Sequence, residues 1–444
     1  MIYDHIPDFL YNLILNDQLP KELRKKYFDF KSHQISDKKF CEDLLKQLKL
    51  SYNNCNYYQE KLCKKFDYTL PEDLTIGNLE KIPYIPSNDY KKSVSRNLEL
   101  LKASLDEIVL FSCSSSTTGI TSIIPRTLED FDQIQYNAVK TYSEFFNWKE
   151  IKPEPYKRAI IFNFSPDRFF LSIMTKKNSK GFEYVDKTRY FSSCINKPFE
   201  YYAHVEYMIK INLLVSIRTF LSTLSVRGGF VMDVSKMLKI IKKVLKTGKW
   251  EKRGVNKILF NGNPALMNYM FENRLLRENI FFDLDEISYV GCSGGGWDGV
   301  KGEVKLDAVN KTRFIENYEK IFNIRSKNIR DIYSLAEVPT IFGGHWSEKY
   351  QDFLFHCPDT TRIIVRDLDK LEPVNEGEEG LLEVITPYGV NGSINQALLV
   401  DDIVEIISKK KCPECGYQGA VFRIIGRLEN AQGKCCSSLI NWSY

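Results

Sequence analysis

Residues 112–119 read Ser-Cys-Ser-Ser-Ser-Thr-Thr-Gly and follow the apolar run 108–112, which we expect to be a strand. Most of these side chains are hydroxyls, and a loop of this kind can wrap phosphate oxygens with hydroxyl and backbone N–H groups. It is not a Walker A loop, because no Gly-Lys-Ser/Thr follows. By itself such a stretch is more often an ordinary polar loop, so the prediction of a phosphate-binding loop depends on the other segments of the chain.

Strand and helix patterns alternate on the C-terminal side of this loop. The expected strands lie in RAIIFNF, GGFVMDV, NKILFNGN, EISYVGCSGGG, IRDIYSLAEV, TRIIVRD and GLLEVIT. This alternation is typical of an α/β fold with mixed sheets. On the N-terminal side, FCEDLLKQLKLSYNNCNYYQEKLCKKF has apolar residues at helical spacing, which predicts a helical leader. We therefore expect a leader over residues 1–105, an α/β core over 106–401 and a small C-terminal β unit over 402–444.

The composition narrows the class of protein. The chain has 444 residues, of which 43% are hydrophobic and 27% charged, and a net charge of +5, which is too even a balance for a dedicated nucleic-acid binder. The N-terminus lacks the charged start of a secretory signal, and the most apolar stretch, 211–226, is shorter than the roughly 20 residues that cross a bilayer. We expect a cytoplasmic protein with no transmembrane segment, whose 11 cysteines are core, metal-binding or reactive thiols rather than disulfides.

Four later segments add features of a nucleotide site. Residues 291–297, Gly-Cys-Ser-Gly-Gly-Gly-Trp, follow an expected strand, and their glycines allow a flat ligand to approach the backbone, although a tight turn explains them equally well. Residues 331–337 place an acid beyond a strand end, where open α/β sheets bind ligands. Residues 400–403 and 426–429 add an acid that can hold a ribose diol and a cation for a phosphate or carboxylate.

In this order the segments resemble the adenylate-forming superfamily, which has a Ser/Thr/Gly loop, a Gly-Gly segment, Tyr-x-x-x-Glu, an Asp that ends a strand, and Gly-Arg. Within it, the chain is most similar to the acyl-protein synthetases of bacterial luminescence operons, which also resemble phenylacetate-CoA ligases. The likeness covers most of the chain and includes YNNCNYYQEKL, IPYIPSNDYKK, FHCPD, VRDLDKLEPVNEGEEGLL, CPECGYQGAVFRIIGR and the terminal AQGKCCS. It implies the large adenylate-forming body, with mixed sheets flanked by helices, truncated on its C-terminal side.

The resemblance implies ATP and Mg²⁺ as cofactors and gives a role to each motif residue. ATP would be bound by Ser114, Ser115, Ser116, Thr117, Thr118, Gly119, Gly294, Gly295, Gly296, Tyr333 and Asp402. The 114–119 loop would cradle the phosphates, residues 294–296 and Tyr333 would flank adenine, and Asp402 would hold the ribose hydroxyls. Glu337, with Thr117 or Thr118, would organise Mg²⁺, and Arg427 would offset charge on the phosphates.

The implied reaction activates a carboxylic acid as an acyl adenylate and transfers the acyl group to a cysteine. The terminal AQGKCCS matches the Arg-Gly-Cys-Ser of the family, so Cys436 would accept the acyl group as a thioester and pass it to a partner protein such as a reductase. The sequence ends soon after Arg427, and we expect it to lack the lysine-bearing domain of about 100 residues that acyl-CoA ligases carry there. Aromatic residues in FNFSPDRFFLSIM favour a medium or long-chain fatty acid, but core packing explains them equally well.

Three departures from the family pattern keep other functions open. Ser116 replaces a glycine, Asp401 adds an acid beside Asp402, and Cys435 precedes the expected acceptor, so either thiol could be acylated or the two could form a disulfide. The alternative enzyme is an aryl- or acyl-CoA ligase of the phenylacetate type, or a ligase that passes the adenylate to an amine. The alternative of another class is a non-catalytic nucleotide-binding scaffold, for which the basic helix 236–246 would be a docking face.

The segment Cys412-Pro-Glu-Cys415-Gly has the spacing of a zinc knuckle. A tetrahedral site needs two further ligands, for which we expect His356 and Cys357. The alternative is a turn with two buried cysteines. His345 is expected to have a structural role, because no catalytic partner is visible for it.

Overall fold

The computed structural model describes residues 35–91, 98–113, 122–130, 133–134, 137, 159–166, 190–195, 230–231, 238–239, 241–243, 245, 257–284, 288–293, 297, 300–301, 304–305, 308–428 and 440–441. Its α-helices are α3 (Asp37–Asn54), α11 (Pro264–Met270) and α12 (Lys311–Phe322). Its strands are β1 (Ile85–Pro86), β2 (Ile108–Cys113), β3 (Ile123–Thr127), β4 (Ala159–Pro166), β5 (Tyr190–Ile195), β6 (Phe230–Val231), β7 (Lys257–Gly262), β8 (Ser288–Ser293), β9 (Val300–Lys301), β10 (Val304–Lys305), β11 (Ile329–Ser334), β12 (Ile341–Ser347), β13 (Asp352–His356), β14 (Arg362–Arg366), β15 (Glu379–Ile385), β16 (Ala397–Ser408), β17 (Val421–Arg427) and β18 (Ile440–Asn441).

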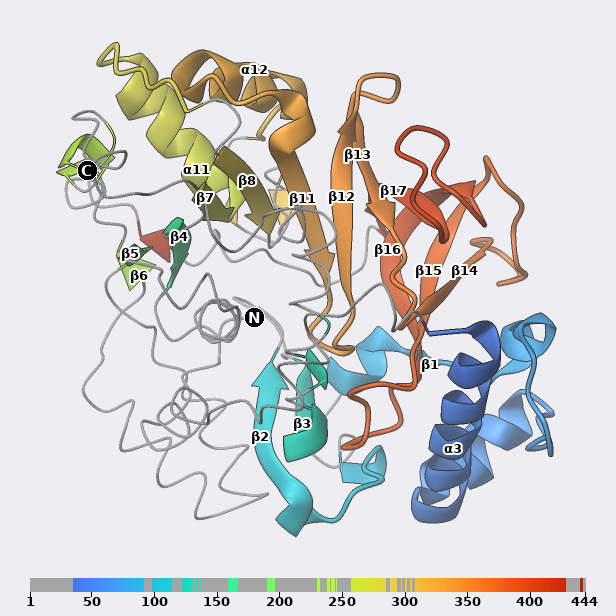
Figure 1. The fold of residues 1–444 in the computed structure, drawn as a ribbon. Coiled ribbons are helices and arrows are strands. Elements are labelled where there is room, and N and C mark those ends of the chain that lie inside the picture. Colours follow the sequence, from blue (N-terminus) through green and yellow to red (C-terminus); the bar gives the residue numbers. More distant parts are fainter. Residues whose placement is uncertain are drawn as a thin grey trace.

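A 12-stranded sheet organises the fold, with strand order β14-β15-β16-β17-β13-β12-β11-β8-β7-β4-β5 and β1 paired to β16 (Figure 1). The strands from β5 to β11 are parallel, whereas those from β11 to β14 are antiparallel. This mixed α/β sheet confirms the expected fold class. Each run that we expected to form a strand contains one, and every boundary follows the apolar pattern to within a few residues.

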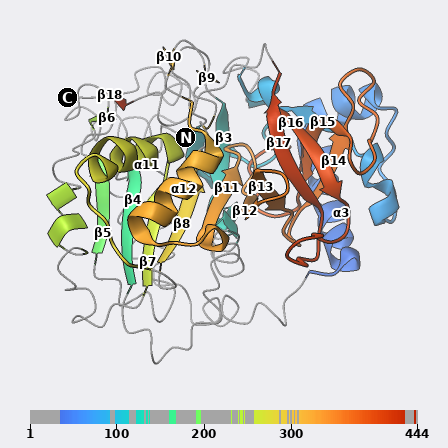
Figure 2. The ribbon, with the colours of Figure 1, turned by 90° about the horizontal axis from the view of Figure 1, so that it is seen from above.

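The helices α11 and α12 cover one face of the parallel strands (Figures 1 and 2). The contact is aromatic: Phe260 of β7 lies 4.5 Å from Phe322 between ring centroids, and Phe271 lies 4.5 Å from Tyr318. Helix α12 begins where the Asn310 side chain accepts a hydrogen bond from a backbone N–H of the first turn, as helix N-caps commonly do. This packing fixes the strands β7, β8 and β11, whose ends lead to the site.

The leader helix α3 lies beside the late strands of the chain (Figure 2) and also contacts the adjacent turn Tyr58–Cys63. The Ser51 hydroxyl of α3 donates to the side chain of Gln396 at 3.1 Å, and the Tyr388 hydroxyl donates to Asp43 at 3.0 Å. Its buried face is the apolar stripe that includes Phe40, as its helical spacing predicts. The buried face of α3 is therefore part of the same core as β14–β16.

The hairpin β2–β3 presents the hydroxyl-rich loop. The two strands pair antiparallel up to Cys113 and Ile123, so residues 114–121 connect them, and these lie outside the described residues. Arg126 of β3 is 2% exposed and donates to the backbone oxygens of Ala336 at 2.6 Å and Gly389 at 3.0 Å. The hairpin is thus bound to the segment just before Glu337.

Within the part of the chain that the structure describes, no helix is both long enough and apolar enough to cross a bilayer. The stretch 211–226 lies outside those residues. Of the basic helix 236–246, Ile241 and Leu245 are buried, and the Lys242 ammonium pairs with Glu278 at 2.7 Å.

Candidate functional site

Tyr333, Asp402 and Arg427 come together although they lie on three strands. The Tyr333 hydroxyl at the end of β11 donates to Asp402 Oδ2 of β16 at 2.7 Å, and Arg427 Nε of β17 lies 3.7 Å from Asp402 Oδ1. Asp402 and Arg427 are direct partners in the β16–β17 register. The sequence predicted all three residues for one nucleotide site, and the fold confirms that they are neighbours.

The electrostatics of this group keep Arg427 charged and Tyr333 protonated. Burial opposes the charge of Arg427, but the carboxylates of Asp402 and Asp401 outweigh it and raise the pKa of the guanidinium. Arg427 Nε is buried and has no hydrogen-bond partner in the described part of the chain. Burial, with the negative charge of Asp402, also raises the pKa of Tyr333, so its phenol remains a hydrogen-bond donor. The guanidinium therefore stays charged and keeps a donor available.

Asp402 does not end its strand, although the motif order of the superfamily has an Asp at a strand end. Asp402 lies inside β16, which continues to Ser408, beside a register shift with β17 between Ile403 and Val404. The pattern at 400–403 did not reveal this, because the strand continues across a register shift instead of stopping. The boundary that we expect between residues 401 and 402 lies within β16, and the division into units remains a prediction.

Asp401 faces away from Asp402, because successive side chains of a strand alternate between its faces. Its carboxylate accepts a hydrogen bond from Asn88 Nδ2 at 3.1 Å and lies 3.9 Å from the Lys91 ammonium. Both donors come from the helical turn Ser87–Lys91, within the IPYIPSNDYKK segment. The second acid that departs from the family pattern therefore has hydrogen-bond and ion-pair partners of its own, and its charge also acts on Arg427.

Glu337 lies three residues beyond β11 and is 6% exposed. Its backbone oxygen accepts from Asn395 Nδ2, and Arg126 holds the preceding carbonyl. No side chain among the described residues donates to its carboxylate, which leaves the oxygens available to a hard cation such as Mg²⁺. Its magnesium role remains a prediction.

The remaining predicted nucleotide and acceptor residues lie outside the described part of the chain. They are Ser114, Ser115, Ser116, Thr117, Thr118, Gly119, Gly294, Gly295, Gly296, Cys435 and Cys436. The strand β8 ends at Ser293, and Ser293 pairs with Ile332 in the parallel β8–β11 register. The strand β8 thus ends, just before the glycine segment in sequence, beside the strand that carries Tyr333.

Trp297 and Asp331 form a contact that the sequence did not indicate. Trp297 Nε1 donates to Asp331 Oδ2 at 2.8 Å. Burial raises the pKa of Asp331 to about 6, against the opposing effects of Trp297 and Lys311. This contact fixes the end of the glycine segment to β11.

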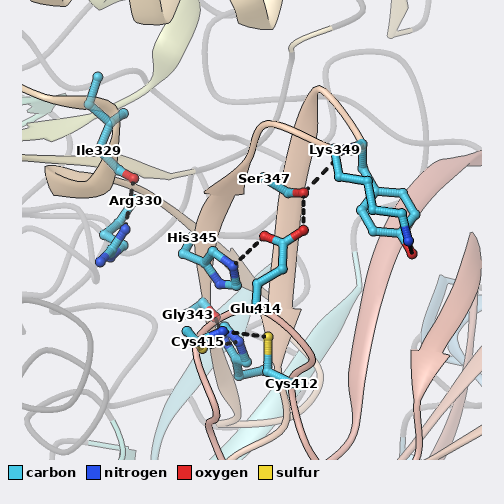
Figure 3. A network of polar contacts seen from close by, with 11 residues as sticks. Ile329, Arg330, Gly343, His345, Ser347, Lys349, Cys412, Glu414 and Cys415 are labelled. Atoms are coloured by element: carbon cyan, nitrogen blue, oxygen red, sulfur yellow. Dashed lines mark hydrogen bonds and ion pairs between the residues drawn. The ribbon is translucent and has the colours of Figure 1, made fainter.

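The knuckle cysteines gather with two histidines. One ligand atom from each of Cys412, Cys415, His345 and His356 lies within 4.8 Å of the other three (Figure 3). As expected, His356 lies beside the cysteines. Cys357 does not join them, because its thiol donates to the backbone oxygen of Thr361. Cys357 follows His356 in sequence and points to the opposite face.

His345 takes the place that we had expected for Cys357. In the β12–β13 register, Gly343 pairs with His356 and His345 pairs with Leu354, so the two histidines are diagonal neighbours on one face. Their rings stack with centroids 4.9 Å apart. The sequence missed this pair because the register of two strands decides it, and no local motif reports that register.

Comparison with solved structures gives the fold a clear counterpart. An open conformation of 2-hydroxyisobutyryl-CoA ligase in complex with 2-HIB-AMP and CoA matches with a TM-score of 0.54 and 14% identity, over 89% of this chain and 70% of that one. The same ligase in the thioesterification state matches with a TM-score of 0.56 and 15% identity, over 94% and 73%. At this identity the likeness shows the fold. No curated protein matches the chain.

A family model agrees with the motifs quoted from the sequence. The model of the acyl-protein synthetases, LuxE, matches residues 174–444, which include Tyr333, Glu337, Asp402 and Arg427. The fold of the solved ligases and the gathering of Tyr333, Asp402 and Arg427 point the same way. The chain belongs to the LuxE acyl-protein synthetase family and is an adenylate-forming ligase.

Proposed function

We propose that the protein uses ATP to activate a carboxylic acid, expected to be a medium or long-chain fatty acid, and then loads the acyl group on Cys436. The observation that carries the proposal is the Tyr333–Asp402 hydrogen bond beside Arg427. It brings an aromatic ring, a carboxylate and a guanidinium together, which supports roles for these groups at adenine, ribose and phosphate.

In the first step, a carboxylate oxygen of the substrate attacks the α-phosphorus of ATP. The bond from this phosphorus to the bridging oxygen breaks, pyrophosphate leaves and an acyl adenylate forms. Positioning and charge neutralisation dominate such a reaction. Arg427 supplies positive charge, and Asp402 orients the nucleotide through its ribose.

Glu337, together with Thr117 or Thr118, would hold Mg²⁺. The buried carboxylate of Glu337 has no donor among the described residues, and a carboxylate is a suitable ligand for this cation. When bound, the metal neutralises charge on the phosphate oxygens as a Lewis acid.

In the second step, the thiolate of Cys436 attacks the acyl carbon, AMP leaves and a thioester forms. A thiolate is a good nucleophile for a mixed anhydride at neutral pH. The thioester then passes its acyl group to a partner protein, expected to be a reductase. The similarity of AQGKCCS to the acceptor motif of the family supports this step.

The test of the first step is ATP–pyrophosphate exchange with carboxylic acids of increasing chain length. We expect exchange that depends on the acid, falls strongly in Arg427→Gln and is retained in Cys436→Ala, because adenylation does not need the thiol. Thioester formation that requires coenzyme A would favour the phenylacetate-type ligase, and acylation of an added amine would favour an amide-forming ligase. ATP binding without exchange under any acid would favour a scaffold and contradict the proposal.

A further inference from the structure

We propose that Cys412, Cys415, His345 and His356 bind one structural Zn²⁺, which joins the β16–β17 connection to the hairpin β12–β13. The inference is independent of the proposed acyl transfer. Two thiolates and two imidazoles are the ligand set of structural zinc sites, and their tetrahedral S₂N₂ geometry favours zinc over other divalent metals.

The ligand atoms are close to the required arrangement. All four lie within 4.8 Å of one another, and Cys415 Sγ lies 3.3 Å from His356 Nε2. With metal–sulfur bonds of about 2.3 Å and metal–nitrogen bonds of about 2.0 Å, neighbouring ligands of a tetrahedral zinc are roughly 3.3–3.8 Å apart. Side-chain rotations therefore suffice to close the site, and the strands need not move.

Each histidine is oriented by a hydrogen bond on its other ring nitrogen. His356 Nδ1 lies 3.0 Å from the backbone oxygen of Gly343, and His345 Nε2 lies 3.2 Å from Glu414 Oε2. Glu414 also accepts from the Ser347 hydroxyl at 2.6 Å (Figure 3). Carbonyl and carboxylate partners of this kind set the tautomer of metal-bound histidines.

These contacts select the nitrogen that each ring offers to the metal. With His345 Nε2 donating to Glu414, the Nδ1 atom keeps its lone pair, and this atom is buried without a hydrogen-bond partner in the described part of the chain. A buried polar atom without a partner is costly, and a bound zinc would satisfy it. His356 offers Nε2, the atom that faces Cys415.

The knuckle itself has the backbone of a metal-binding turn. The Cys415 amide points to Cys412 Sγ at 3.5 Å, and the Gly416 amide donates to the Cys412 oxygen at 3.1 Å. Gly416 has a φ of 75°, a conformation that favours glycine. Both thiols are thereby presented on one side of the turn.

The location of the cluster gives the metal a mechanical role. The strands β13 and β17 pair at only two positions, Phe355 with Phe422 and His356 with Val421. This short pairing nevertheless connects β16 and β17, which carry Asp402 and Arg427, to the part of the sheet that carries Tyr333. Zinc would add a cross-link beside it. Loss of the metal should therefore loosen residues 402–428 more than the distant helix α3.

The direct test is metal analysis of the purified full-length chain, with Cys415→Ser compared with Cys357→Ser. Cys357 is a neighbouring buried thiol outside the cluster, so it is the matched control. We expect about one equivalent of zinc in the wild type and in Cys357→Ser, and little in Cys415→Ser. The absence of zinc from the wild type after reduction and incubation with ZnCl₂, or its full retention in Cys415→Ser, would overturn the proposal.

A second measurement does not depend on the folding of a variant. Wild-type protein stripped of metal and reloaded with Co²⁺ should show the thiolate-to-cobalt charge-transfer band and the intense visible bands of a tetrahedral site. Removal of the metal should increase hydrogen exchange in residues 402–428 and leave that of α3 unchanged. An octahedral spectrum without the thiolate band, or a Cys412–Cys415 disulfide that excludes metal, would contradict the site.

Discussion

Replacement of Asp402 by asparagine tests the nucleotide role of the Tyr333–Asp402–Arg427 group. The asparagine oxygen can still accept from the Tyr333 hydroxyl, which lies 2.7 Å from Oδ2, so the change removes charge and little volume. A carboxylate has about four acceptor positions, which leaves room for two ribose hydroxyls beside Tyr333. The effect of Asp402→Asn on the Kd for ATP therefore measures how much the negative charge of Asp402 strengthens its hydrogen bonds to the ribose hydroxyls.

The expected size follows from the two hydroxyl contacts. Hydrogen bonds to a charged acceptor contribute about 1.5–3 kcal/mol and those to a neutral one about 0.5–1.5 kcal/mol, so two contacts lose roughly 2–3 kcal/mol. Since about 1.4 kcal/mol is a factor of ten, the Kd for ATP should rise roughly 30- to 150-fold. Calorimetric titration measures this directly, and the thermal midpoint reports whether the variant is folded.

The neighbouring acid provides the control. Asp401→Asn removes the same charge from the opposite face, where Asn88 and Lys91 hold it, and should lower thermal stability while changing the Kd for ATP less than about threefold. The wild type should also prefer ATP to 2′-deoxy-ATP, and Asp402→Asn should lose that preference. Equal weakening by both variants, or an unchanged Kd in Asp402→Asn, would refute the assignment.

Three further variants test other contacts of the site. Burial raises the pKa of Asp331 from 3.8 to about 6, so the folded state holds the proton more tightly than the unfolded state. Roughly 3 kcal/mol of the free energy of unfolding should therefore be lost as pH rises from about 4 to 6. In urea unfolding, Asp331→Asn should lack this pH dependence, and an unchanged pH dependence would show that Asp331 is not its source. Arg126→Met should lower the free energy of unfolding by about 2–5 kcal/mol, because the buried oxygen of Gly389 and the partly buried oxygen of Ala336 lose their donor. A loss below about 1 kcal/mol in denaturant titrations would argue against this role. Glu337→Gln should raise the Mg²⁺ concentration needed for half-maximal pyrophosphate exchange by about tenfold or more, and an unchanged Mg²⁺ dependence would exclude Glu337 as a ligand.

Much of the fold was predictable because it rests on local periodicity. The β-branched and aromatic residues of the runs that become β4, β7, β8 and β11 mark these strands in the sequence. The helix α3 shows its buried face at helical spacing. Tyr333, Asp402 and Arg427 were predicted as a group only because the order of their motifs resembles a known superfamily.

Other features depend on register and on long-range packing. His345 joins His356 through the β12–β13 pairing, and a shift of one residue would have placed it on the other face. Arg126 is a buried cation whose partners lie more than 200 residues away, so no sequence pattern distinguishes it from a surface arginine. Asp402 continues a strand across an irregularity, which composition does not reveal.

The central claim is that the activated acyl group is carried by Cys436. Its most direct test is the intact mass of the protein after incubation with ATP, Mg²⁺ and carboxylic acids of different length, with Cys436→Ala and the matched control Cys435→Ala. We predict an acyl adduct in the wild type and in Cys435→Ala that hydroxylamine removes and that Cys436→Ala lacks. Pyrophosphate release without any adduct, or an adduct retained in Cys436→Ala, would contradict the account.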